Sequence, residues 1–150
     1  MKLLKASLCL FFAFIFFVAC SSIQKSALEK TEYREDIEPI SNRFPLIVGI
    51  ESCFWKADSI GSFGIGPSSY WMKGFLVLSD GAGTELTNLY EWEDAEIVFP
   101  VGMNPDITGL TNFQWSYSRE FSDDVKGSSF VGDFFFDVKM GVIYFDLESN

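Results

Sequence analysis

The 150-residue sequence contains no histidine. That absence excludes Ser-His-Asp and Cys-His catalysis, imidazole acid–base chemistry, a histidine pH switch, and zinc or haem sites that use a histidine ligand. A serine nucleophile would need a lysine or a carboxylate as its base. We therefore expect a protein that is not an enzyme and that works by binding.

Basic residues are also scarce: 11 Lys and Arg face 21 Asp and Glu, which gives a net charge of −10. Affinity for nucleic acid comes from Lys and Arg contacts to phosphate. The charge balance therefore predicts no nucleic-acid partner.

The N-terminus combines two basic residues, Lys2 and Lys5, with an uncharged apolar run over residues 6–19. As a helix this run of 14 residues would rise about 21 Å, short of the roughly 30 Å hydrocarbon core of a bilayer. The pattern predicts that residues 1–19 are a secretory signal peptide and not a membrane span.

The run ends Phe17-Val18-Ala19-Cys20-Ser21. These residues resemble the lipobox of bacterial lipoproteins, in which small residues precede an invariant cysteine; Val18 and Ala19 match, and Phe17 stands where leucine is usual. The resemblance implies diacylglycerol on Cys20, cleavage before it, acylation such as palmitate on the new N-terminus, and a location in the bacterial cell envelope. In a Gram-negative source, the serine after the cysteine implies the outer membrane. The alternative is an ordinary signal peptide cut after Ala19.

Three cysteines occur in the chain, and the resemblance implies that Cys9 leaves with the signal and that Cys20 is acylated. Only Cys53 then remains, so no intrachain disulfide can form and the fold must be stabilised by its core. Without a histidine partner, Cys53 is expected to be a half-buried small hydrophobe and not a nucleophile. The mature chain loses Lys2 and Lys5 and carries a net charge of −12, which favours a cationic partner.

The composition changes near residue 44. Residues 20–43 begin with the lipidated Cys20 and hold nine charged groups without Gly, Trp or Phe, so we expect a tether. Within it, residues 26–38 have the composition of a short helix, which Pro39 would end. Residues 44–150 contain all twelve glycines between short β-branched and aromatic runs, which predicts a β domain.

The expected strands are short and closely spaced, at residues 45–56, 70–78, 85–90, 95–101, 111–118, 130–139 and 142–147. Their spacing is typical of one small antiparallel sheet curled into a barrel or a sandwich, and the only helix expected is the N-terminal one. The intervening segments are interpreted as a glycine-rich loop (58–69), a tight hairpin turn (79–84), a Pro-containing turn (102–109) and an acidic loop (120–129).

No cofactor or metal site is predicted. The glycines at 61, 64 and 66 match neither the dinucleotide fingerprint nor a P-loop. The acidic runs at 91–96 and 123–124 do not match a calcium-binding loop. Carboxylates alone can hydrolyse glycosides, but only in a cleft that small antiparallel sheets rarely form. We therefore assign no catalytic residue.

The C-terminal hairpin has the most decisive pattern. An odd loop would bury Asp133 and Asp137 among aliphatic side chains, which costs several kcal/mol for each unpaired acid. An even loop places Val138 opposite Ile143, Phe136 opposite Phe145 and Phe134 opposite Leu147, and it separates apolar from polar side chains. The predicted core residues are therefore Phe134, Phe136, Ile143 and Phe145.

The opposite face of this hairpin is expected to expose Phe135 and Tyr144 among acids that include Asp137 and Asp146. An aromatic pair ringed by carboxylates suits a basic partner, so these four residues, with Phe63 from the glycine-rich loop, are the predicted binding site. The alternative is that another segment covers this face and both rings are core.

Together these features predict a non-enzymatic cell-envelope lipoprotein that binds another, cationic protein, as inhibitor, immunity and envelope-assembly lipoproteins do. The second interpretation is a β-barrel lipoprotein that carries a small hydrophobic ligand or a carbohydrate. A carboxylate hydrolase is a third, weaker one.

Overall fold

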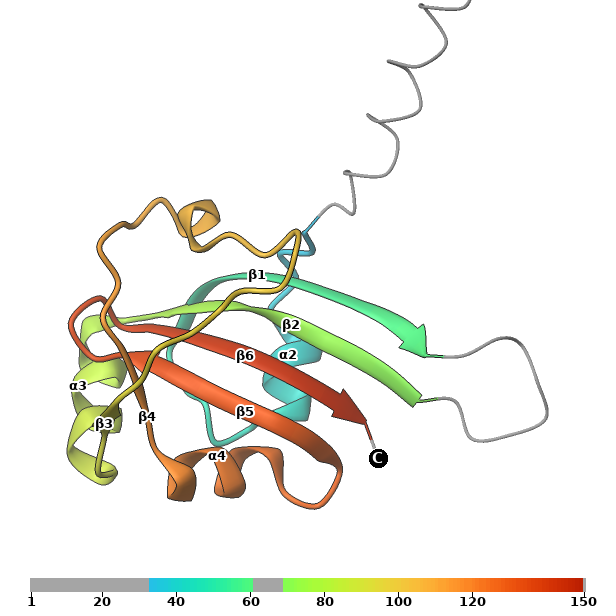
Figure 1. Ribbon diagram of the computed structural model, residues 1–150. Helices are drawn as coiled ribbons and strands as arrows, with labels where there is room; N and C mark the ends of the chain where they lie inside the picture. Colours follow the sequence, from blue (N-terminus) through green and yellow to red (C-terminus); the bar gives the residue numbers. More distant parts are fainter. Residues whose placement is uncertain (1–32, 61–68, 150) are drawn as a thin grey trace, which may run out of the picture. The chain divides into compact units, whose positions relative to one another are not determined.

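The computed structural model describes residues 33–60 and 69–149. The predicted signal peptide, the lipidation site Cys20 and the loop residue Phe63 lie outside the described residues. The chain divides after Glu32 into two units, and the unit that begins at Tyr33 is described here (Figure 1).

The described residues form strands and short helices in a mixed order along the chain. The helices are α2 (Glu38–Arg43), α3 (Asp80–Leu89), α4 (Arg119–Lys126) and the 3-10 helix η1 (Pro105–Thr108). The strands are β1 (Ile50–Ile60), β2 (Ser69–Leu78), β3 (Glu93–Asp94), β4 (Trp115–Tyr117), β5 (Phe130–Asp137) and β6 (Val142–Ser149).

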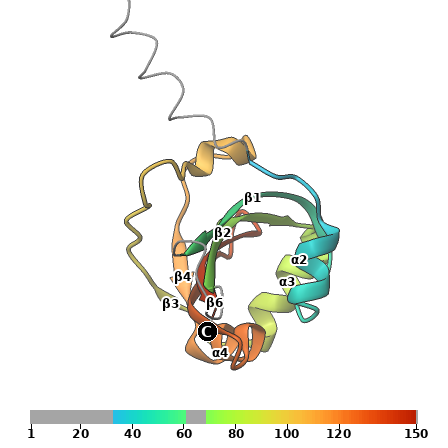
Figure 2. The same ribbon diagram turned by 90° about the vertical axis from the view of Figure 1, so that its right-hand side faces the viewer.

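The strands form a single antiparallel sheet in the order β1-β2-β6-β5-β4-β3. The prediction of a mainly β fold built on one curled antiparallel sheet is confirmed (Figure 2). The two end strands, β1 and β3, do not pair with each other in the described structure, so the sheet is open and does not close into a barrel.

Helices α2, α3 and α4 cover one face of the sheet (Figure 2). The predicted core residues Phe134, Phe136, Ile143 and Phe145 are all completely buried there. Phe44, which follows α2, packs its ring against Phe134 and Phe145. Full burial of each large side chain contributes roughly 1.5–3 kcal/mol, so this face provides the main hydrophobic core.

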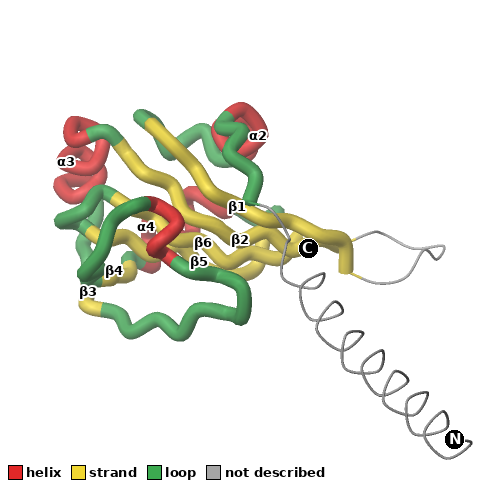
Figure 3. Tube along the Cα trace, turned by 90° about the horizontal axis from the view of Figure 1, so that it is seen from above, coloured by secondary structure: helices red, strands yellow, loops and turns green. Residues whose placement is uncertain are grey.

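The other face is covered over part of its area by residues 95–114, a long connection that contains η1 and is here called the 95–114 segment. Figure 3 shows this connection on the side of the sheet opposite α2 and α3. Phe99 and Met103 from the segment pack with Phe75, Val142 and Tyr144 of the sheet. The sheet is therefore buried on both faces where the segment crosses it.

Two predicted loop or strand regions are helices. Residues 79–84 were expected to be a hairpin turn and 85–90 a strand, but together they form α3. The Ser79 hydroxyl accepts the N–H of Ala82 and caps the helix, and Ala82 and Leu86, one turn apart, face the core. The prediction was wrong because Leu86 and Leu89 are spaced as in a helix, and over so few residues helical spacing cannot be told from the alternation of a strand.

The expected acidic loop at 120–129 is largely helix α4. Ser118 caps it by accepting the N–H of Phe121. Phe121, Ser122 and Val125 are buried, whereas Glu120, Asp123 and Asp124 are exposed. The acidic run is therefore the solvent face of an amphipathic helix.

The tether was predicted to extend to residue 43, but residues 33–43 belong to the folded unit. Arg34 forms a two-way backbone bridge with Trp55 of β1, and Ile40 of α2 is completely buried. Pro39 lies in the first turn of α2 and does not end a helix, because a proline at that position loses no intrahelical hydrogen bond. The folded domain thus includes residues 33–43.

The strand predicted at 95–101 was wrong, and the one predicted at 111–118 was too long. Residues 95–101 form no strand, and only Trp115–Tyr117 pair with β5. Asn112 has φ of 63°, which is incompatible with an extended strand. The Gln114 N–H donates to the side-chain carboxylate of Asp137 and not to a backbone carbonyl of β5.

The β5–β6 hairpin keeps the predicted faces but not the predicted pairs. Phe136 lies opposite Ile143, Phe134 opposite Phe145, and Asp137 opposite Val142. The register therefore differs by two residues from the prediction, and the loop has four residues. A shift of two preserves which side chains share a face, and this is why the core was predicted correctly despite the wrong partners.

Candidate functional site

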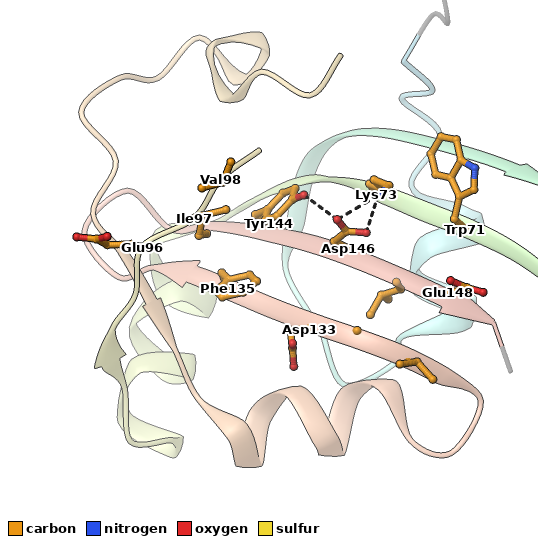
Figure 4. Close-up of a pocket in the computed structure, with 13 residues that line it drawn as sticks. Trp71, Lys73, Glu96, Ile97, Val98, Asp133, Phe135, Tyr144, Asp146 and Glu148 are labelled. Carbon is orange, nitrogen blue, oxygen red and sulfur yellow. Dashed lines mark hydrogen bonds and ion pairs between the residues drawn. The ribbon is translucent and has the colours of Figure 1, made fainter. Parts of the chain in front are cut away.

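A groove of about 450 Å³ lies on the sheet face that the 95–114 segment covers only in part (Figure 4). Its floor is formed by β2, β6 and β5, and residues 96–98 form one wall. The residues that line it are Trp71, Lys73, Glu96, Ile97, Val98, Val131, Gly132, Asp133, Phe135, Tyr144, Asp146, Leu147 and Glu148.

Strand pairing arranges the floor in rows that cross the three strands. The first row is Trp71–Glu148–Val131, and the second is Lys73–Asp146–Asp133. The third row, Phe75–Tyr144–Phe135, lies under the edge of the 95–114 segment. Successive rows are about 7 Å apart, because two residues of an antiparallel strand rise by that distance.

The second row contains an ion pair. Lys73 Nζ lies 2.9 Å from one Asp146 carboxylate oxygen and donates to the other at 3.1 Å. The Tyr144 hydroxyl donates to the same carboxylate at 3.3 Å. Burial, with the negative charge of Asp146, holds the pKa of Tyr144 far above its ordinary value, so the phenol remains a hydrogen-bond donor. The arrangement neutralises Lys73 and fixes the centre of the floor.

Asp133 faces α4 and not the open groove, as Figure 4 shows. Its carboxylate accepts hydrogen bonds from Tyr117 at 3.0 Å and Ser122 at 3.4 Å, and Lys126 Nζ lies 3.8 Å away. These partners occupy Asp133, so it anchors α4 to β5.

Two carboxylates in the groove have no such partner. Glu96 on the wall and Glu148 on the floor are exposed and form no hydrogen bond or ion pair within the described structure. Lys73 Nζ lies 5.6 Å from the centre of the Trp71 ring, within the range of a cation–π contact. The groove therefore combines surplus negative charge with partly exposed aromatic rings, which suits a cationic group.

Gly132 allows β5 to approach β6 closely in the floor of the groove. Its φ is +116°, and a Cβ atom at this position would lie 2.1 Å from the backbone oxygen of Asp146. Only glycine fits both the backbone conformation and the close approach.

The structure brings three of the five predicted binding residues to this groove: Phe135, Tyr144 and Asp146. The expectation that both rings stand exposed is wrong for Tyr144, which is 2% exposed beneath Phe99 of the 95–114 segment. Phe135 is only partly buried, at the edge of the groove.

Asp137 was expected on the outer face, but it is completely buried. Its carboxylate accepts the backbone N–H groups of Gln114, Lys139 and Met140. A carboxylate enclosed by three donors holds the hairpin turn and is not a docking group. Its polarity suggested the solvent face, but the Asp137 carboxylate is enclosed by its own turn and by the Gln114 N–H, which comes from a segment distant in sequence.

Sequence reasoning missed Trp71, Lys73 and Glu96. The strand predicted at 70–78 contained a usable signal, because Trp71, Lys73 and Phe75 share a face by alternation. Nothing in the sequence paired that face with Asp146, 73 residues from Lys73.

Two other features carry little chemistry. Cys53 is completely buried, and burial raises the pKa of its thiol to about 11, which agrees with a structural thiol. Among the described residues, no group of three or more His, Cys, Asp or Glu side chains could hold a metal ion.

Within residues 33–60 and 69–149, no helix is both long enough and apolar enough to span a membrane. The chain matches no protein-family model, and neither a curated protein nor a solved structure is significantly similar to it.

Proposed function

We propose that this protein is a non-enzymatic bacterial envelope lipoprotein, anchored through acylated Cys20, that binds a cationic segment of another protein. The anchor rests on the lipobox-like residues 17–21 of the sequence. In a Gram-negative cell, the protein would lie on the outer membrane and face the periplasm.

The observation that supports binding of a cation is the groove over β2, β6 and β5. The Lys73 charge is matched by Asp146, so Glu96 and Glu148 leave the groove with surplus negative charge. Trp71 and Phe135 supply ring surface for the methylene stem of a lysine or arginine. The net charge of −12 on the mature chain would also accelerate encounter with a cationic partner.

A carrier of small hydrophobic ligands has less support. That function needs a cavity enclosed by a closed barrel, whereas this sheet is open and the groove is at the surface. Carbohydrate is the ligand class that the same aromatic floor would otherwise suit, so an oligosaccharide belongs in the test as a competitor.

The test is titration of the full-length protein in detergent micelles with a ten-residue lysine peptide. We expect saturable binding that weakens with salt, because the contacts are ionic. A double variant, Glu96→Gln with Glu148→Gln, should bind at least tenfold more weakly. The control is Glu91→Gln with Asp94→Asn, which removes two exposed charges outside the groove and should have little effect.

Equal affinity of the groove variant and the wild type would contradict the proposal. Competition of the peptide by a neutral oligosaccharide would instead favour the carbohydrate function.

A further inference from the structure

The row Trp71–Glu148–Val131 lies at the open end of the groove. None of its residues belongs to the Lys73–Asp146 ion pair. Figure 4 shows the Trp71 indole extending from β2 and the Glu148 carboxylate on the neighbouring strand β6, where the two residues are paired. Val131, the third member of the row, is 60% exposed. An aromatic face, a free carboxylate and an aliphatic side chain thus lie next to one another across three strands.

The same protein shows which ligand this combination holds. At the edge of β1, the Arg34 guanidinium lies 4.0 Å from the centre of the Trp55 ring and forms two hydrogen bonds, at 3.1 and 2.6 Å, with the Asp36 carboxylate. An indole and a carboxylate there enclose an arginine of the chain itself. At Trp71 and Glu148 the indole and the carboxylate are present, but no arginine of the described chain lies between them.

Lys73 does not fill this role. Its ammonium group is held by both oxygens of Asp146 in the next row and lies 5.6 Å from the Trp71 ring centre, farther than Arg34 from Trp55. Because Asp146 neutralises Lys73, a second cation near Trp71 meets little net repulsion from it. Glu148 remains available as the counter-ion.

We propose that Trp71, Glu148 and Val131 form a subsite for an arginine side chain of the partner protein. This inference rests on the proposed function and specifies the residue that the groove recognises. The planar guanidinium would stack on the Trp71 indole and donate two parallel hydrogen bonds to Glu148, while its methylene stem packs on Val131. An ammonium group has no planar face to stack on the indole and cannot donate two parallel hydrogen bonds to one carboxylate, so the subsite should prefer arginine to lysine.

The experiment compares three blocked tripeptides, Gly-Arg-Gly, Gly-Lys-Gly and Gly-citrulline-Gly, against the full-length protein in micelles. Binding is followed by NMR through the indole N–H signals, and the Trp71→Phe variant identifies the signal of Trp71. We expect the arginine peptide to shift that signal saturably and to bind at least fivefold more tightly than the lysine peptide. Citrulline keeps the shape but lacks the charge, so it should bind at least tenfold more weakly than arginine.

Glu148→Gln should remove most of the preference for arginine, whereas the control Glu91→Gln should leave it unchanged. Equal binding of arginine and lysine at Trp71, or shifts confined to the indole signals of the other tryptophans, would overturn the arginine subsite while a cationic groove remained. If neither these peptides nor the lysine decapeptide bound the wild-type protein, the proposed function would be refuted as well.

Discussion

Asp137 provides the sharpest test of how the sheet face is built. Its buried carboxylate accepts the Lys139 N–H at 3.0 Å and the Met140 N–H at 2.8 Å on one oxygen. The other oxygen accepts the Gln114 N–H from the 95–114 segment. One side chain therefore closes the β5–β6 turn and attaches to the sheet the segment that covers Tyr144.

Replacing Asp137 by alanine removes all three of these charge-assisted hydrogen bonds. At about 1.5 kcal/mol for each bond to a charged group, the loss is about 4.5 kcal/mol. Asp137→Asn keeps one oxygen for two of the donors but turns an amide N–H₂ toward the Gln114 N–H, so we expect a loss of about 2 kcal/mol. Such losses are a large fraction of the roughly 5–15 kcal/mol that stabilises an ordinary domain.

The assay is urea unfolding followed by tryptophan fluorescence. Asp94→Ala, in the exposed strand β3, serves as the control and should lie within about 0.5 kcal/mol of the wild type. If Asp137→Ala were as stable as this control but lost affinity for the lysine decapeptide, the structural role would be refuted. Asp137 would then be the docking acid that its sequence position suggested.

Three further outcomes are expected. Gly132→Ala should destabilise the domain by about 3 kcal/mol or more, because the positive φ costs roughly 1–3 kcal/mol and the new Cβ clashes with the Asp146 carbonyl. In the same urea titration, Gly81→Ala should stabilise α3 by up to about 1 kcal/mol, because a Cβ at Gly81 meets nothing within 4 Å. Cys53 should resist a thiol reagent at pH 8 until the protein unfolds, and rapid labelling of the native protein would contradict its burial. Because the pKa of its thiol is about 11 in the folded protein and 9.0 ordinarily, the contribution of Cys53 to stability should be complete below pH 9 and decline between pH 9 and 11. Cys20→Ser should abolish palmitate labelling and release the protein from membranes, and retention of both would refute the lipid anchor.

The alternation of side chains predicted the core of the hairpin from the sequence alone. Phe134, Phe136, Ile143 and Phe145 are buried as expected, although each pair is shifted by two residues from the predicted register. Parity along a strand is a local property, so it survives an error in loop length. Register also depends on the turn between the strands, and here the Asp137 carboxylate of that turn is held by the distant Gln114 N–H as well as by Lys139 and Met140.

Helices α3 and α4 show a second limit. Their sequences contain serine caps and apolar residues at helical spacing, but each is short enough to be interpreted as a turn followed by a strand or as an acidic loop. Short helices gain most of their stability from packing on a core. For α4, that packing is the contact of Phe121 with Phe134, which the sequence does not reveal.

The sequence by itself determined the acidic charge, the absence of histidine chemistry, the lipobox-like N-terminus, and which residues of β5 and β6 share a face. All of these follow from composition or from spacing over a few residues. The tertiary structure decided which part of that shared face is open. The 95–114 segment buries Tyr144, while the pairing of β2 with β6 brings Trp71 beside Glu148 and Lys73 beside Asp146. Contacts between residues so far apart in the chain depend on which strands become neighbours and on which connection crosses them, and local patterns carry no record of either.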